Sequence, residues 1–184
     1  MVSLCLNDEE KLLLKSLIGK KLIKIRHDPL DKFGQETVYG RIELFFEDSI
    51  VLIDYDYELY PLFGSPDDEH PRFSIRNIVE DEATSALQDV TQIDVRCNRL
   101  ITGIALAEDC VEIEWDGKEG SSRVLKAIIF QFGKDEIAIQ GDYMMPLLDL
   151  IRGENVASKL AKPGGEYEND PEVKYKAERS LLNL

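Results

Sequence analysis

The sequence has few of the residue types on which common catalytic and metal sites depend. Its 184 residues include only two histidines and three cysteines, and no two cysteines form a CxxC pair. A histidine-rich metal site, a zinc knuckle or a disulfide framework is therefore not expected. The sequence also lacks a glycine-rich phosphate loop and a GxSxG motif, which argues against P-loop nucleotide enzymes and α/β-hydrolases.

Long apolar runs and basic residues are also scarce. The apolar runs are only a few residues long, far short of the ~20 that span a bilayer. The start of the chain, MVSLCLNDEEK, lacks the basic region of a secretory signal, and with the unpaired cysteines this predicts a cytoplasmic protein. The net charge is -14. Such a chain repels nucleic acid and anionic membranes, and it favours fast encounter with a basic protein.

Hydrophobic residues make up 43% of the chain, which is typical of a folded globular protein. A short helix is expected over residues 8–18, where Asn7 is a good N-cap and Gly19 a suitable end. Further helices are predicted at 81–89 and 145–153. Alternating patterns predict strands at 20–27, 72–79 and 90–98, and hairpins over 38–60, 99–117 and 123–143. The first hairpin is predicted to turn near 47–49 and the third at 133–135. The segment GKEGSS is expected to be a flexible loop.

The middle hairpin, over 99–117, is predicted to turn at Glu108 and Asp109. Its first part, TGIALAED, resembles GRIELFFED about 61 or 62 residues earlier. An internal duplication with halves 20–89 and 90–153 is one interpretation, and two unrelated hairpins are the other. Residues 1–161 are predicted to form one α+β domain of mainly antiparallel β-sheets with a few short helices. A loop and a C-terminal helix are predicted to follow over 162–184.

The segment IDYDYELY holds the most distinctive acidic cluster. Alternation places Asp54, Asp56 and Glu58 on one side of a strand, with successive members ~6.6 Å apart. That spacing is too wide for all three to bind one ion without a bulge. A metal-dependent enzyme that uses two of them remains an alternative, but the chain lacks the basic surface that a nuclease normally carries.

A protein-binding surface uses the same residues better, because acids beside tyrosines suit an Arg- and Lys-rich partner. Tyr55 and Tyr57 share a side with Val51 and Ile53, which predicts that both pack in the core, whereas Tyr60 lies on the acidic side. The residues predicted to contact a partner are Asp54, Asp56, Glu58, Tyr60, Asp67, Asp68, Glu69, Glu112, Glu114 and Asp116. No catalytic residue, metal site or cofactor is predicted. The two histidines, His27 and His70, are not assigned a role, and His27 is expected at the surface.

The chain is small and acidic and lacks a catalytic set of residues. In this it resembles bacterial immunity proteins, and the stretches that carry the resemblance are GRIELFFEDSIVLIDYDYE and TGIALAEDCVEIEWDG. These proteins neutralise the toxin domains of contact-dependent growth inhibition and related polymorphic toxin systems. The resemblance covers residues 20–153 and includes no diagnostic motif. It implies a non-enzymatic inhibitor of a basic toxin, such as a tRNA-cleaving RNase, and a Whirly-like pair of packed sheets. A generic acidic adaptor is a further alternative.

Overall fold

The computed structural model describes residues 2–32, 35–59, 69–79, 91–143, 145–168 and 170–184, and most of them lie in β-strands. The strands are β1 (Val2–Leu4), β2 (Lys21–Lys32), β3 (Gln35–Phe45), β4 (Ile50–Leu59), β5 (Glu69–Ile78), β6 (Ile93–Leu100), β7 (Gly103–Trp115), β8 (Lys118–Phe132), β9 (Asp135–Gly141), β10 (Leu147–Gly153) and β11 (Val173–Asn183). The described helices are α1 (Asp8–Lys15) and the short 3-10 helices η2 (Val156–Lys159) and η3 (Gly165–Tyr167).

One hydrogen-bonded sheet joins all these strands, in the order β11-β7-β8-β9-β10-β3-β2-β6. Two additions branch from this path, because β1 pairs with β8 and the β4–β5 hairpin pairs with β3. Every pairing is antiparallel except that of β1. The prediction of a mainly antiparallel sheet is confirmed. The predicted pair of separate sheets and the α+β class are not confirmed.

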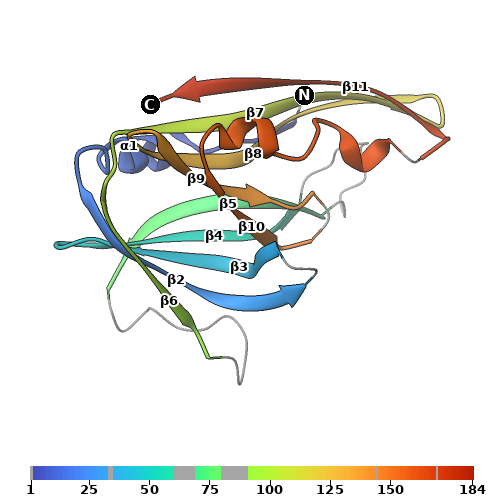
Figure 1. Cartoon of the computed structure of the whole chain (residues 1–184). Helices are drawn as coiled ribbons and strands as arrows, with labels where there is room; N and C mark the ends of the chain where they lie inside the picture. Colours follow the sequence, from blue (N-terminus) through green and yellow to red (C-terminus); the bar gives the residue numbers. More distant parts are fainter. Residues whose placement is uncertain (1, 33–34, 60–68, 80–90, 144, 169) are drawn as a thin grey trace.

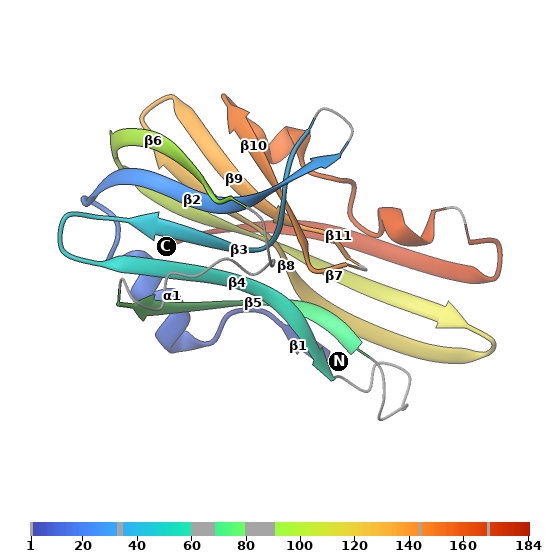
Figure 2. The ribbon, with the colours of Figure 1, turned by 90° about the horizontal axis from the view of Figure 1, so that it is seen from below.

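The sheet curls so that β7, β8 and β11 form one layer and β2, β3 and β4 another (Figures 1 and 2). The main core cluster lies between them, with Ile104, Leu106 and Ile128 from the first layer and Leu44 and Ile53 from the second. A smaller cluster covers the outer side of β7–β9, where alanines allow η2 to approach closely. Residues 104–107 of β7 and 127–130 of β8 are accordingly buried on both sides and are all apolar.

Gly40 marks the point where the sheet forks. Along one edge of β3, residues 37–39 pair with β10, and residues 41–45 pair with β4. Gly40 lies between them at φ +43°, and a Cβ there would meet the Tyr55 carbonyl oxygen at 3.1 Å and the Pro146 carbonyl oxygen at 3.2 Å. The Tyr55 hydroxyl donates to the Asp142 carbonyl across the fork. The far half of β4 therefore leaves β3 and pairs with β5 alone.

Helix α1 follows the predicted start but is shorter than expected. The Asn7 side chain accepts from the Glu10 backbone N–H at 2.8 Å, and the Glu10 carboxylate accepts from the Asn7 N–H at 2.8 Å, which is a capping box. Gly19 lies at φ +86°, after the helix has ended in turns. Glu10 also accepts from the Ile75 backbone N–H at 3.2 Å. The helix therefore satisfies a backbone donor of strand β5.

Three predicted elements are wrong, and one lies outside the described residues. Residues 145–153 form mostly strand β10 instead of a helix, and residues 173–183 form strand β11 instead of the C-terminal helix. The expected loop over 117–122 belongs mostly to strand β8. The burial of β11 alternates residue by residue along most of its length, which is the period of a strand. The helix predicted over 81–89 is outside the described part of the chain.

The predicted turn at Glu108 and Asp109 is also wrong, because β7 continues through both residues to Trp115. Both carboxylates are buried. Glu108 pairs with Arg123 at 2.8 Å, and Asp109 accepts two hydrogen bonds from Arg179 at 2.6 Å each. These arginines supply the charge that allows two acids inside a strand. TGIALAED therefore does not end in a turn, whereas GRIELFFED does. The duplication prediction depended on a turn after both segments.

Candidate functional site

The β4 acidic row, which consists of Asp54, Asp56 and Glu58, faces away from the core, as predicted. Val51, Ile53 and Tyr55 are buried on the other side of the strand, and the Tyr55 ring packs at a tilt of 44° against Phe73, with the ring centroids 4.5 Å apart. The prediction that Tyr57 also packs in the core is wrong, because its exposed fraction is 40%. Tyr57 follows the fork, where only β5 still supports the strand.

Arginines from neighbouring strands lie against two of the three acids in this row. Arg41, opposite Asp54 on β3, approaches its carboxylate at 3.3 Å. Arg72 on β5 lies 3.3 Å from Glu58 and 2.7 Å from Glu10. These contacts do not favour the metal-dependent alternative, because a bound ion would have to compete with two guanidinium groups.

Asp56 is exposed and accepts the Tyr57 backbone N–H at 2.8 Å. Tyr60, Asp67 and Asp68 lie outside the described residues, so their predicted place in the surface is not tested. Glu69 begins β5, but the structure does not describe its side chain. In this part of the predicted surface, the structure therefore describes the side chains of Asp54, Asp56 and Glu58 alone.

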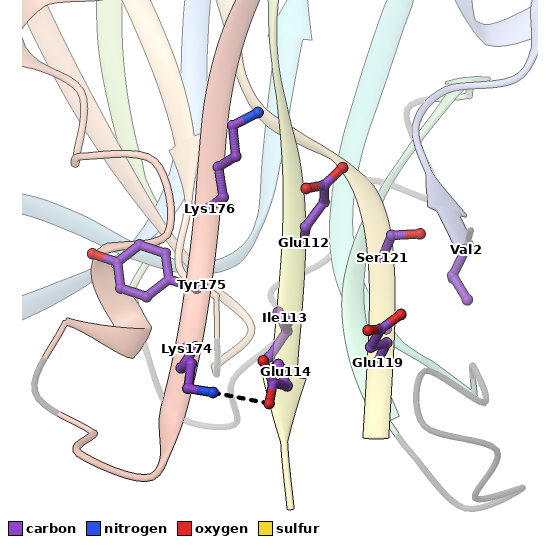
Figure 3. A pocket seen from close by; sticks show the side chains of 10 residues that line it. Val2, Glu112, Ile113, Glu114, Glu119, Ser121, Lys174, Tyr175 and Lys176 are labelled. Atoms are coloured by element: carbon purple, nitrogen blue, oxygen red, sulfur yellow. Dashed lines mark hydrogen bonds and ion pairs between the residues drawn. The ribbon is translucent and has the colours of Figure 1, made fainter. Parts of the chain in front are cut away.

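Glu112 and Glu114 of the second predicted acidic row line an open trough of about 840 Å³. Glu112 and Glu114 come from β7, Glu119 and Ser121 from β8, and Val2 from β1 (Figure 3). Asp116 does not line it. That residue lies at φ +49° in the exposed turn between β7 and β8.

Strand β11 supplies the opposite wall of the trough and two lysines that sequence reasoning missed. Lys174 and Lys176 lie opposite Glu114 and Glu112 in the β7–β11 register. The Lys174 ammonium is 3.0 Å from Glu114, and both side chains are largely exposed. Tyr175, between the two lysines, points to the other side of the strand (Figure 3). Apolar–polar alternation along residues 173–178 is the sequence signal that would have predicted a strand with both lysines on one side.

The trough exists because β7 and β8 extend beyond the hydrophobic core. On the core side, Ile104 and Leu106 are followed at the same two-residue interval by Glu108, Cys110 and Glu112. The β7–β8 register shifts between Ala107 and Glu108, which leaves Lys126 as the extra residue of a bulge. The same face of the sheet therefore changes from apolar to charged where the opposite layer ends.

A buried polar network fixes β11 beside the trough. Besides Arg179, Asp109 accepts a hydrogen bond from the Tyr143 hydroxyl at 2.5 Å. Lys126 lies 3.5 Å above the Tyr143 ring and donates to the Gly141 carbonyl. Arg179 also donates to the Ala161 carbonyl at 2.8 Å. The strand that carries the lysines is therefore held by the buried Asp109 carboxylate and, at its exposed side, by the bond from Arg179 to Ala161.

His27 is buried, which corrects the expectation of a surface position. Only 2% of it is exposed, and its Nε2 lies 3.5 Å from the Glu36 carboxylate. Burial lowers the pKa of His27, against the opposing effect of Glu36. Arg152 binds the same carboxylate through two hydrogen bonds of 2.9 Å. His27 is therefore held neutral beside an ion pair that is already formed.

Within the described ranges, no group of three or more His, Cys, Asp or Glu side chains is arranged to hold a metal ion. No described helix is long and apolar enough to cross a membrane. No protein-family model, curated protein or solved structure matches the chain.

Proposed function

We propose that the protein is an immunity protein that binds and neutralises a basic toxin domain, such as a tRNA-cleaving RNase. The trough of Glu112, Glu114 and Glu119 is the observation that carries this proposal. It is open, has a volume of about 840 Å³, and carries three carboxylates against the two lysines of β11. A surface of this kind suits the phosphate-binding site of a nuclease, which is built from arginines and lysines.

The proposed mechanism involves no turnover. The net charge of -14 attracts a basic domain over a distance, which raises the association rate. At the trough, carboxylates pair with basic side chains that the toxin would otherwise use to hold its substrate. The β4 row extends the charged surface through Asp56, and exposed Tyr57 adds a large, stiff side chain of the type enriched at binding hot spots. The proposed place of action is the cytoplasm, where such a toxin would meet RNA.

A co-expression experiment tests this proposal. A basic toxin domain, sought in the reading frame directly upstream, is induced together with wild-type protein or with the variant Glu112→Lys/Glu114→Lys. We expect wild type to protect the cells and the variant to lose protection, because two attractive positions become repulsive. The matched control is Glu9→Lys/Glu154→Lys, which changes the net charge equally at two exposed residues away from the trough. Equal protection by both variants would show that the trough is not the binding site, and failure of wild type to protect would reject the function.

A second experiment uses the lysine that already occupies the trough. Replacing Lys174 by Gln releases Glu114 from its 3.0 Å ion pair. Affinity for the toxin domain should then rise a few-fold, because an exposed pair of this kind contributes at most about 1 kcal/mol. Calorimetric titration measures the change, and binding should weaken as salt rises. Affinity that falls on Lys174→Gln would mean that the lysine itself contacts the partner.

A further inference from the structure

Strand β11 ends the sheet with an open backbone edge. All eleven of its residues pair with β7 on one side, and no other described strand pairs with it on the other side (Figure 1). An edge of this length is a template for pairing with another strand. Leu181, near the end of β11, is 52% exposed, so the edge also carries apolar surface.

The hydrogen bonds of the ladder show which residues face the open edge. The Leu184 backbone N–H donates to the Ile104 carbonyl at 3.0 Å. Because backbone groups in an antiparallel strand point to alternate sides, the even-numbered residues of β11 face β7. The Val173 N–H agrees with this assignment, since it donates to Asp170 instead of to β7. Tyr175, Ala177 and the further odd-numbered residues therefore present their N–H and C=O groups outward.

The charges along this edge are complementary to themselves. If two copies of β11 pair antiparallel about a two-fold axis at Ala177, Lys176 of each copy lies opposite the partner's Glu178. Even-numbered residues form the non-hydrogen-bonded pairs, in which opposite side chains come closest. Within one chain, Lys176 and Glu178 lie on the same face of β11, with Nζ and Oε1 3.3 Å apart, and both side chains are mostly exposed. They are therefore accessible for exchange between copies.

Neighbouring registers are less favourable. An axis at Lys176 places this lysine opposite Lys176 of the second copy. An axis at Glu178 likewise places two glutamates opposite each other. An axis at Tyr175 places Lys174 opposite the partner's Lys176 in both copies. Like charges directly opposite each other are destabilising. Of these four registers, only the one centred on Ala177 forms two opposite-charge pairs with no like-charge pair.

We propose that the protein forms a two-fold dimer in which the β11 strands of two copies pair antiparallel about Ala177. On the outward side of each strand, the backbone groups between Val173 and Leu181 would form roughly eight hydrogen bonds, because the Val173 N–H of each copy already donates to Asp170. Val173 then lies opposite the partner's Leu181, which covers apolar side chains. The axis is perpendicular to the sheet, so both troughs open on the same side of one continuous sheet. This proposal does not depend on the identity of any toxin.

Charge exchange tests the register. Wild-type protein should sediment as a dimer, with twice the 21.0 kDa mass of the chain. Lys176→Glu and Glu178→Lys should each be monomeric, because each places two like-charge pairs at the centre of the interface. An equimolar mixture of the two variants should form a heterodimer, since every central pair is then of opposite charge. The variant that carries both exchanges should again be a homodimer.

The mixture also separates the proposal from misfolding, because variants that cannot fold would not combine. Lys162→Glu is the matched control for the change of charge. It removes another exposed ion pair, to Glu168 at 2.8 Å, outside β11, and should remain a dimer. A monomeric wild-type protein would overturn the proposal, as would single variants that dimerise as tightly as wild type or a mixture that forms no heterodimer.

Discussion

The Asp109–Arg179 pair should be one of the most costly side-chain contacts to break in the described structure. Asp109 is fully buried, and the Arg179 side chain is 14% exposed. In the variant Arg179→Met, the carboxylate keeps only its hydrogen bond from Tyr143. Breaking a buried ion pair by removing one partner costs about 3–5 kcal/mol. The slight exposure of Arg179 favours the lower end, so we expect a loss of about 3 kcal/mol.

Urea denaturation followed by circular dichroism measures this loss. With a typical slope of about 2 kcal/mol per molar urea, the midpoint should fall by about 1.5 M. Adding Asp109→Leu to Arg179→Met should recover most of the loss, because no unpaired charge then remains buried. Lys174→Met breaks an exposed pair and should change stability by less than about 1 kcal/mol. The reasoning fails if Arg179→Met costs no more than Lys174→Met, or if the double variant is less stable than the single one.

Three further predictions follow from single sites. Gly141→Ala should cost about 2 kcal/mol, because its Cβ would overlap Cζ of Tyr55. By the same urea titration Gly165→Ala should be nearly neutral, because its Cβ would have no contact closer than 3.8 Å. Burial lowers the pKa of His27 below 6.5, so the unfolded chain binds more protons than the folded chain as the pH falls through 6.5. The stability of the wild-type protein should therefore decrease there more steeply than that of His27→Gln. Burial raises the pKa of Cys5 to about 11, so its alkylation by iodoacetamide should be slow at pH 8 and fast in urea, as followed by mass spectrometry.

Local patterns predicted the hairpins whose strands and turns lie close together in the sequence. The turn at Glu47–Ser49 is confirmed, and Phe46 closes it with a hydrogen bond to Ser49 at 2.9 Å. The turn over 133–135 is likewise confirmed between β8 and β9. In both cases a polar interruption separates two alternating apolar runs. Such a signal needs no knowledge of distant contacts.

The failures arise where distant residues decide the structure. Glu108 and Asp109 resemble a turn because acids are rarely buried, but Asp109 meets its partner Arg179 seventy positions later. At the C-terminus, Val173, Ala177 and Leu181 recur at four-residue intervals, which fits both a helical face and alternate positions on one side of a strand. Only the pairing with β7 resolves this ambiguity. Tertiary contacts therefore override the local pattern in both segments.

Cross-strand pairing also changes what the acidic rows can do. In the sequence all the acids look equally available, but the sheet brings Arg41, Arg72 and Lys174 to within 3.3 Å of carboxylates in the two rows. These pairs reduce repulsion between closely spaced acids in a chain of net charge -14. Largely exposed pairs such as that of Lys174 stabilise a protein little, so a basic partner can replace them at low cost. Affinity for the proposed partner would then come mainly from packing and desolvation around the trough, while the overall charge would set how quickly that partner arrives.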